Sequence, residues 1–237
     1  MNYIVSDSKY DFSSDNINII ALLYDESGSM EQHVYAMQKA NNAFYDDFSK
    51  FEEKGSIAIS KATFNGNYWM SAFKEVKHFN TSYHADGATH LYSSIVRTVE
   101  STIAYYNELI KRLNVRARIT FLVFTDGEDN EDYGRYMNNA KAAITELNSL
   151  DATTVFVAFG DAIATGAGEK LGFTCTKNIT TVKELVACLG SELSKSCKEQ
   201  SRSSYSLKSE FFSKASKDNA ADTAADQAIV DDDFFNV

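Results

Sequence analysis

Two apolar runs, each ending abruptly at an aspartate, constrain the fold of this chain more than any other feature. Residues 17–24 are almost entirely aliphatic and aromatic, and Asp25 follows them at the start of an acidic turn that contains glycine. Residues 118–125 form a second such run, and Asp126 follows it with a glycine behind. Nearly continuous apolar runs of this length are typical of strands buried on both faces, as in parallel sheets. We therefore predict two buried strands with a carboxylate at the carboxyl end of each.

The rest of the pattern alternates strands with helices. Apolar residues recur at helical spacing over residues 34–51 and 91–113, which predicts two amphipathic helices. Between them, residues 56–64 and 68–78 have strand character and are joined through an Asn-Gly dipeptide, the strongest short signal for a hairpin. Further along, we predict helix, strand, helix, strand and helix at residues 133–150, 153–159, 162–171, 173–176 and 182–201. This alternation predicts an α/β fold, with a doubly wound, mainly parallel sheet flanked by helices and one antiparallel edge hairpin.

Oxygen-bearing side chains gather around the two aspartates and in one further loop. The candidates for binding one cation are Asp25, Ser27 and Ser29 in DESGSM, Thr89 in DGATHLYSS, and Asp126 in FTDGEDN. In an open α/β sheet, ligands bind outside the carboxyl ends of the strands where the strand order reverses. Neighbouring strands at that point would bring both carboxylates together. Taken singly, the motifs are also typical of an Asp-Gly turn or of a serine that caps a helix.

The chemistry of these side chains selects a hard divalent cation. Carboxylate and hydroxyl oxygens suit Mg²⁺, Mn²⁺ or Ca²⁺, whereas zinc or copper would require a Cys/His cluster, and none stands near these motifs. We predict Mg²⁺, with Mn²⁺ and Ca²⁺ as alternatives. Three further acidic residues stand beside the motifs, Glu26, Glu128 and Asp129, and could support the cation's ligands from behind, but we expect them to be solvated.

The three motifs, in this order, resemble the metal-ion-dependent adhesion site of a von Willebrand factor A-type (VWA) domain. The shared features are D-x-S-x-S after a first strand, a threonine in a loop before a helix, and an aspartate ending the fourth strand. The resemblance implies direct cation contacts from Ser27, Ser29 and Thr89, and contacts from Asp25 and Asp126 that are direct or pass through water. It also implies one open coordination position for a carboxylate of the partner. Family members often have two glycines before the threonine, whereas an alanine stands directly before it here, which puts the conformation of this loop in question.

The charge of the candidate ligands indicates what the site would attract. Two aspartates and three neutral hydroxyls only just balance a divalent cation, which leaves it electrophilic toward an incoming carboxylate. We therefore expect a cytoplasmic interaction module or adaptor that binds an Asp or Glu of a protein partner, and no enzyme. One alternative is a structural or assembly subunit, of a host or a virion, that makes contacts through its fold or its C-terminal tail. Another is metal-dependent phosphoryl transfer, but the haloacid-dehalogenase-like pattern needs an aspartate where Ser27 stands, and the chain has no G-x-x-x-x-G-K-[ST] or G-x-S-x-G motif.

The two ends of the chain differ in composition from its middle. We predict an N-terminal extension at residues 1–14, a VWA domain at 15–201, and a disordered linker with an acidic-aromatic tail at 202–237. The tail carries Asp231, Asp232, Asp233, Phe234 and Phe235. It is similar to the docking tail of single-stranded-DNA-binding proteins, and the other interpretation is a solubilising end. Because it is tethered, it could also offer a carboxylate to the metal site of its own chain or of a neighbour.

Composition narrows the partners and the compartment. The formal net charge of −10 argues against nucleic-acid binding, which needs a basic face. No apolar stretch is long enough to span a membrane, and the first residues lack a signal-peptide pattern, so we expect a cytoplasmic location. Three scattered cysteines, Cys175, Cys188 and Cys197, predict buried thiols rather than a disulfide framework. Proline is absent, and Asn, Lys and Ile are abundant. This bias is typical of an AT-rich genome and indicates a bacterial or phage source, with the host cytoplasm as the compartment for a phage protein.

Overall fold

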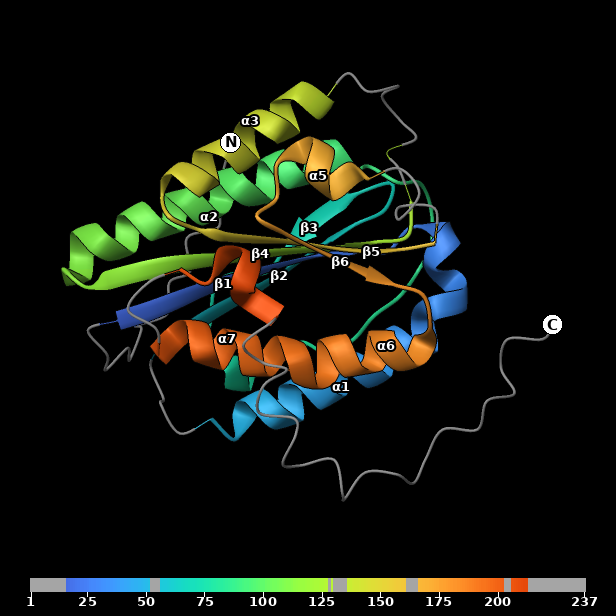
Figure 1. Ribbon diagram of the computed structural model, residues 1–237, viewed down its shortest axis with the longest axis horizontal. Helices are drawn as coiled ribbons and strands as arrows, with labels where there is room; N and C mark the ends of the chain where they lie inside the picture. The colour runs from blue at the N-terminus through green and yellow to red at the C-terminus, as the bar shows by residue number, and fades with distance from the viewer. Residues whose placement is uncertain are drawn as a thin grey trace.

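The computed structural model describes residues 16–51, 56–127, 129, 136–160, 166–202 and 206–212. Within these residues, six strands form one sheet in the order β3-β2-β1-β4-β5-β6 (Figure 1). The strands are β1 (Asn16–Asp25), β2 (Ile57–Phe64), β3 (Tyr68–Met70), β4 (Arg116–Thr125), β5 (Thr153–Phe159) and β6 (Cys175–Ile179). Neighbouring strands are parallel, except that β2 and β3 are antiparallel. The predicted fold class, including the antiparallel edge hairpin, is confirmed.

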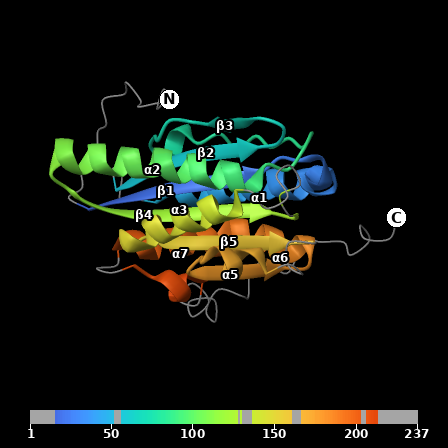
Figure 2. The same ribbon diagram turned by 90° about the horizontal axis from the view of Figure 1, so that it is seen from above.

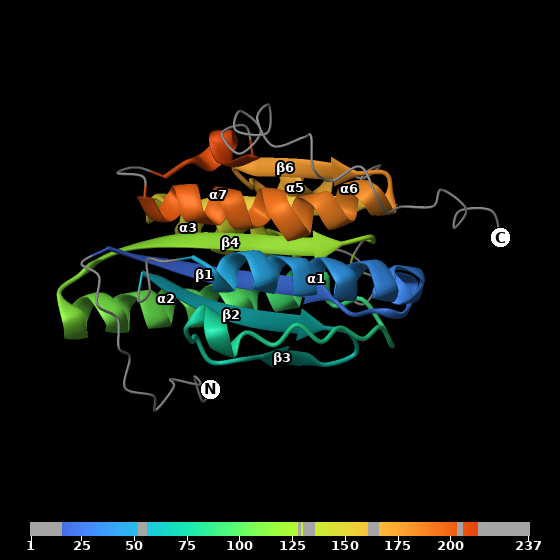
Figure 3. The same cartoon turned by 90° about the horizontal axis from the view of Figure 1, so that it is seen from below.

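Helices cover both faces of this sheet. One face carries α2 (Leu91–Leu113), α3 (Met137–Ser149) and α5 (Ala167–Leu171), as the view from above shows (Figure 2). The other face carries α1 (Val34–Ser49), α6 (Val182–Ala187) and α7 (Leu193–Arg202), which lie in front of the strands in the view from below (Figure 3). Short helical turns complete the described chain: η1 (Gly28–His33), η2 (Val76–His78), the π-helical η3 (Cys188–Glu192) and η4 (Lys208–Glu210).

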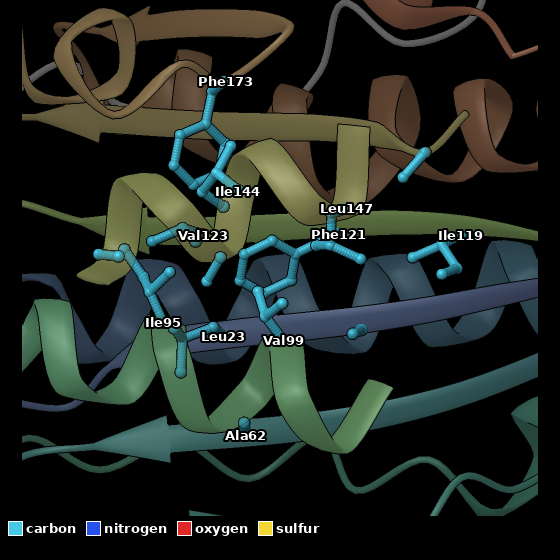
Figure 4. Packing of buried hydrophobic residues seen from close by; sticks show 14 of the residues in the cluster. Leu23, Ala62, Ile95, Val99, Ile119, Phe121, Val123, Ile144, Leu147 and Phe173 are labelled. Carbon is cyan, nitrogen blue, oxygen red and sulfur yellow. The ribbon is translucent and has the colours of Figure 1, made fainter. Parts of the chain in front are cut away.

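The apolar run of β1 serves two hydrophobic cores at once. Because side chains alternate along a strand, Ile19 and Leu23 enter the core under α2 and α3, while Ile20 and Leu22 enter the core under α1, α6 and α7. Leu23 lies close to α2 and to the side chains of β4 in the first of these cores (Figure 4). Burial on both faces explains why this strand reads as a continuous apolar run rather than an alternating one.

The predicted strand at residues 68–78 is wrong beyond Met70. After β3 the chain keeps one backbone hydrogen bond, from the Ser71 amide to the Lys61 carbonyl, and an isolated bridge at Lys74, and then forms the 3-10 turn η2. Phe73 is buried in the core under α2, whereas Phe79 packs against the core under α1. In a regular strand, residues 73 and 79 would lie on the same face, so their contacts with opposite cores show that the segment crosses the edge of the sheet. The alternating apolar residues reflect this crossing and not a ladder. The hairpin loop also holds three residues, because Phe64 pairs with Tyr68.

Boundaries in the C-terminal half shift by a few residues. The helix predicted at 133–150 is α3, with residues 133–135 outside the described chain, and the helix predicted at 162–171 is described only from Gly166. The strand predicted at 173–176 is β6, which runs two to three residues later because Thr174 exchanges hydrogen bonds with Thr154 before the ladder begins. The helix predicted at 182–201 consists of α6, η3 and α7.

Residues 206–212, which lie in the predicted linker, pack against the domain. Leu207 and Phe211 are buried in the core under α1, α6 and α7. The backbone amide of Leu207 donates to the side-chain oxygen of Gln200 at 2.8 Å. We therefore propose that the domain extends at least to residue 212. Residues 1–15 and 213–237, including the acidic-aromatic tail, lie outside the described residues.

Two smaller predictions also have an outcome in the structure. The three cysteines are free thiols, buried at positions 188 and 197 and half-buried at 175, as predicted. Among the described residues, no helix is long and apolar enough to cross a membrane.

Candidate metal centre

The two motif aspartates lie at the same edge of the sheet, on adjacent parallel strands. Asp25 is the last residue of β1, and Asp126 follows β4 directly. The register pairs Tyr24 with Phe124, so the carboxyl ends of the two strands are level. The chain moves from β1 to β2 on one side and reaches β4 on the other, which makes this the point where the strand order reverses. The two strands are thus neighbours, which is the condition for the two carboxylates to meet at one edge.

The carboxylate of Asp25 is buried and fixed in one orientation. One oxygen accepts a hydrogen bond from the backbone N–H of Ser27 at 2.9 Å, and the other accepts from the hydroxyl of Thr125 at 2.6 Å. The pKa of Asp25 is raised to about 6, mainly by burial and to a smaller extent by the nearby charge of Asp126, while the hydrogen bonds from Ser27 and Thr125 act in the opposite direction. This carboxylate therefore has two of its lone pairs occupied and its negative charge disfavoured by the surroundings.

The serines connect the first motif to the third. The hydroxyl oxygens of Ser27 and Ser29 are 3.2 Å apart, and the Ser29 hydroxyl donates to a carboxylate oxygen of Asp126 at 2.8 Å. Four of the five predicted ligands thus form a row of oxygen atoms, in which Asp25, Ser27 and Asp126 are buried and Ser29 is exposed.

The loop that carries Thr89 is fastened to the first motif by its backbone. The amide of Asp86 donates to the carbonyl of Glu26 at 2.7 Å, and the amide of Gly28 donates to the carbonyl of Gly87 at 2.9 Å. Gly87 has a φ of +87°, and a Cβ at this position would come within 3.2 Å of the Gly66 amide nitrogen, so glycine is required there. Thr89 is buried two residues later. The loop meets the first motif even though an alanine stands before the threonine.

The sequence predicted that the flanking acidic residues are solvated, but two of them have partners within the protein. Glu26 is largely buried and lies 3.5 Å from the Nζ atom of Lys61, a lysine on β2 that is itself buried. Asp129 accepts a hydrogen bond from the backbone amide of Tyr92 at 2.9 Å and so caps the first turn of α2. The expectation is therefore wrong for both. Glu128 lies outside the described residues.

Three residues that support the site escaped the sequence reasoning. The hydroxyl of Tyr83 donates to the backbone carbonyl of Asp25, and the Nζ atom of Lys61 donates to the carbonyl of Ser82 while it lies 5.4 Å from the centre of the Tyr24 ring. The third is Thr125, whose position beside Asp25 follows from the parallel register. For Lys61, the one available signal was a lysine within a predicted strand.

The atoms present fit a hard divalent cation. Within the described part of the chain, no three Cys, His, Asp or Glu side chains gather into a group that would hold a metal ion. The candidate centre instead combines two carboxylates with serine hydroxyls, which are oxygen donors of the kind that Mg²⁺, Mn²⁺ and Ca²⁺ accept. A cation would also offset the repulsion between the charges of Asp25 and Asp126.

Comparison with known proteins identifies the fold. No family model matches the sequence, and no curated protein matches it. Among solved structures, the chain is similar to the pilus adhesin SpaC from Lactobacillus rhamnosus GG, with a TM-score of 0.62 and 10% identity over 79% of this chain and 31% of that one. It is similar to a D319A mutant of the PilB minor pilin from Streptococcus sanguinis, with a TM-score of 0.55 and 12% identity over 82% of this chain and 64% of that one.

A single-domain structure is matched over nearly its whole length. The SpRpn10 VWA domain has a TM-score of 0.51 and 11% identity to this chain, and the match covers 73% of this chain and 93% of that domain. The chain spans less than two thirds of SpaC and of PilB, so only part of each protein corresponds to it. At these identities the likeness concerns the fold, and this chain has the fold of a von Willebrand factor A-type domain.

Proposed function

We propose that this chain is a protein-interaction module that binds an acidic side chain of a protein partner through a divalent cation. The proposed ligands are Asp25, Ser27, Ser29, Thr89 and Asp126. The observation that carries the proposal is the 2.8 Å hydrogen bond from Ser29 to Asp126, because it joins two motifs 97 residues apart in the sequence. The likeness to a pilus adhesin and a minor pilin supports a role in adhesion or interaction.

Each residue of the row has a distinct role in this proposal. Asp25, buried and oriented by Ser27 and Thr125, supplies a negative charge of fixed position. The hydroxyls of Ser27 and Ser29 supply neutral oxygens, and exposed Ser29 marks the side from which a partner can approach. When bound, the cation supplies a Lewis-acidic position for a carboxylate. Mg²⁺ is the expected ion, with Mn²⁺ and Ca²⁺ as alternatives.

The surroundings of Asp25 disfavour an enzymatic role for it. A nucleophilic carboxylate must reach its substrate, but Asp25 is fully buried and both of its oxygens accept hydrogen bonds. We therefore propose that the chain acts by binding and not by catalysis. Its role as an adaptor and its cytoplasmic location stay predictions.

The first test measures cation binding directly. Purified wild-type protein is titrated with Mn²⁺ and Mg²⁺ by calorimetry, beside Asp25→Ala and Ser29→Ala. Asp46→Asn is the matched control, because Asp46 is an exposed aspartate on α1. We expect the wild type and the control to bind one ion and both site variants to lose binding. Equal binding by all four proteins would show that the cation binds elsewhere.

The second test measures the partner. Wild-type protein and Asp25→Ala are used as bait in lysate of the source cell, with Mg²⁺ or with EDTA, and the captured proteins are identified by mass spectrometry. A partner that is lost in EDTA and with the variant supports the proposal. A partner retained in both conditions would show that the contact is made by another surface.

A further inference from the structure

A polar pocket of about 460 Å³ opens beside the candidate metal centre. Its walls come from the β2–β3 turn, from the first two turns of α2, and from Tyr136 at the start of α3. Hydroxyl groups of Tyr68, Ser93 and Ser94 belong to residues that line it, and Arg97 brings a positive charge. None of the described residues that line the pocket is acidic. The lining is therefore suited to an anion.

The positive charge is held in a defined place. The guanidinium of Arg97 lies 5.6 Å from the centre of the Tyr68 ring, a cation–π contact that joins α2 to the edge hairpin. Within the described residues, no carboxylate forms an ion pair with Arg97. The α2 terminus contributes less, because Asp129 already accepts from the Tyr92 amide. Arg97 is thus the main source of attraction for an anion.

A buried hydroxyl without a partner lies directly behind the pocket wall. Ser94 is fully buried, and its hydroxyl oxygen has no hydrogen-bond partner among the described residues. The carbonyl of His90 accepts from the Ser94 amide at 3.3 Å, and the Ser94 hydroxyl does not donate to it. A buried hydroxyl without a partner is unfavourable, but only the neighbouring Ser93 hydroxyl is exposed enough to donate a charge-assisted bond to a carboxylate in the pocket.

The pocket lies next to the candidate metal centre, both through residues adjacent in sequence and through residues that meet in space. Its wall begins at His90, the residue directly after the candidate ligand Thr89, so the two Cα atoms are about 3.8 Å apart. Gly66, another lining residue, is the one that a Cβ on Gly87 would strike. A partner segment that places one carboxylate at the cation is therefore close enough to place a neighbouring residue beside the pocket.

We propose that this Arg97 pocket binds a second carboxylate of the same partner segment, so that the chain selects segments with two acidic side chains. This inference rests on the proposed function for the first carboxylate. Arg97 would pair with the second carboxylate, and the partly exposed Ser93 hydroxyl would donate a hydrogen bond to it. The cation provides attachment and the pocket provides selectivity for the second charge.

The pocket is tested first without a cation. The full chain, labelled with ¹⁵N and kept in EDTA at constant ionic strength, is titrated with sodium acetate and, separately, with inorganic phosphate. We expect acetate to shift the amide signals of Ser93 and Ser94, and Arg97→Gln to lose these shifts. Arg112→Gln is the matched control, since Arg112 lies on the same helix roughly 22 Å from Arg97. Shifts with phosphate but not with acetate, or no shifts, would overturn the proposal.

The second experiment separates the pocket from the metal centre. Fluorescent peptides with one aspartate, or with two at several spacings, are titrated against wild type, Arg97→Gln and Arg112→Gln in Mg²⁺ and in EDTA. We expect the best two-aspartate peptide to bind the wild type roughly tenfold more tightly than the one-aspartate peptide, and Arg97→Gln to remove that gain. If EDTA abolishes binding while Arg97→Gln has no effect, the pocket inference fails and the metal centre stands. If Arg97→Gln weakens binding that EDTA leaves intact, the cation proposal fails and the pocket stands.

Discussion

The two ends of β1 and β4 both bury polar side chains, but with opposite chemistry. At the amino end, the hydroxyl of Thr120 donates to the Asn18 side chain at 3.0 Å, and the Asn18 amide donates to the carbonyl of Cys197 at 3.3 Å. All of these groups are neutral, and each bond joins the sheet to itself or to α7. At the carboxyl end, two carboxylates lie close enough for the charge of Asp126 to raise the pKa of Asp25. The polar groups at the amino end stabilise the fold, whereas the charges at the carboxyl end do not contribute to its stability.

The same contrast extends to β5. The hydroxyl of Thr153 donates to the Gln200 oxygen at 3.0 Å, and the Leu207 amide donates to the same oxygen at 2.8 Å. One neutral acceptor thus fastens β5, α7 and the segment after it. Satisfied neutral networks of this kind specify a structure, whereas uncompensated charges are typical of functional sites. Substitutions at the two ends should therefore differ in their effect on cation affinity and in the sign of their effect on stability.

The largest expected effect is the loss of cation binding at the carboxyl end only. Asp25→Ala should weaken Mn²⁺ affinity by more than about 100-fold, since loss of even an outer supporting group costs 10–100-fold at metal sites. Asn18→Ala, at the other end of the same strand, should leave the affinity within about twofold of wild type while lowering stability. Calorimetric titration of both variants measures this. Equal losses would mean that the two ends do not differ in function.

The next effect concerns stability at the amino end. Gln200→Ala should lower the free energy of unfolding by roughly 2–4 kcal/mol, because two buried donors, the Thr153 hydroxyl and the Leu207 amide, lose their acceptor. Urea unfolding gives the value, and Glu199→Ala is the control on the exposed side of the same helix. A loss no larger than that of the control would show that this network does not hold the C-terminal segment.

At the carboxyl end, removing the buried charge should raise the free energy of unfolding rather than lower it. In EDTA at pH 7, Asp25→Asn should stabilise the chain by roughly 1–3 kcal/mol, since the pKa of Asp25 is about 6 in the folded chain against a usual 3.8. A raised folded-state pKa means that wild-type stability is fullest below pH 4 and falls as the pH rises through about 6. The gain from the variant should therefore be present at pH 7 and absent near pH 4. Urea unfolding at both pH values decides this, and a variant less stable at pH 7 would contradict it.

The sequence predicted the parts of this comparison that depend on local pattern. The continuous apolar runs identified β1 and β4, and the general rule for α/β sheets placed Asp25 and Asp126 at one edge. Long-range contacts were not accessible in the same way. The crossing of Phe73 and Phe79 to opposite cores looks like strand alternation in sequence, and the pairing of Glu26 with Lys61 depends on two strands meeting in space.

Thr125 shows the limit for the site itself. Its hydroxyl is the partner of a buried Asp25 oxygen, but threonine at the end of a strand is so common that its type carries no signal. Only the parallel register of β1 with β4 brings the two side chains together. The sequence therefore predicted which side chains carry oxygen for a cation and missed the residue that holds one of them in position.

The smallest expected effect comes from this supporting contact. Thr125→Val preserves the shape of the side chain and removes the hydroxyl that donates to Asp25 at 2.6 Å. Cation affinity should fall by roughly tenfold, because the carboxylate keeps its Ser27 contact and loses its second one. Thr125→Ser restores the hydroxyl and should restore the affinity, which a change in packing alone would not do. If the valine variant binds Mn²⁺ as tightly as wild type, Asp25 is positioned by its backbone and by Ser27, and the carboxyl end needs less support than the hydrogen bonds indicate.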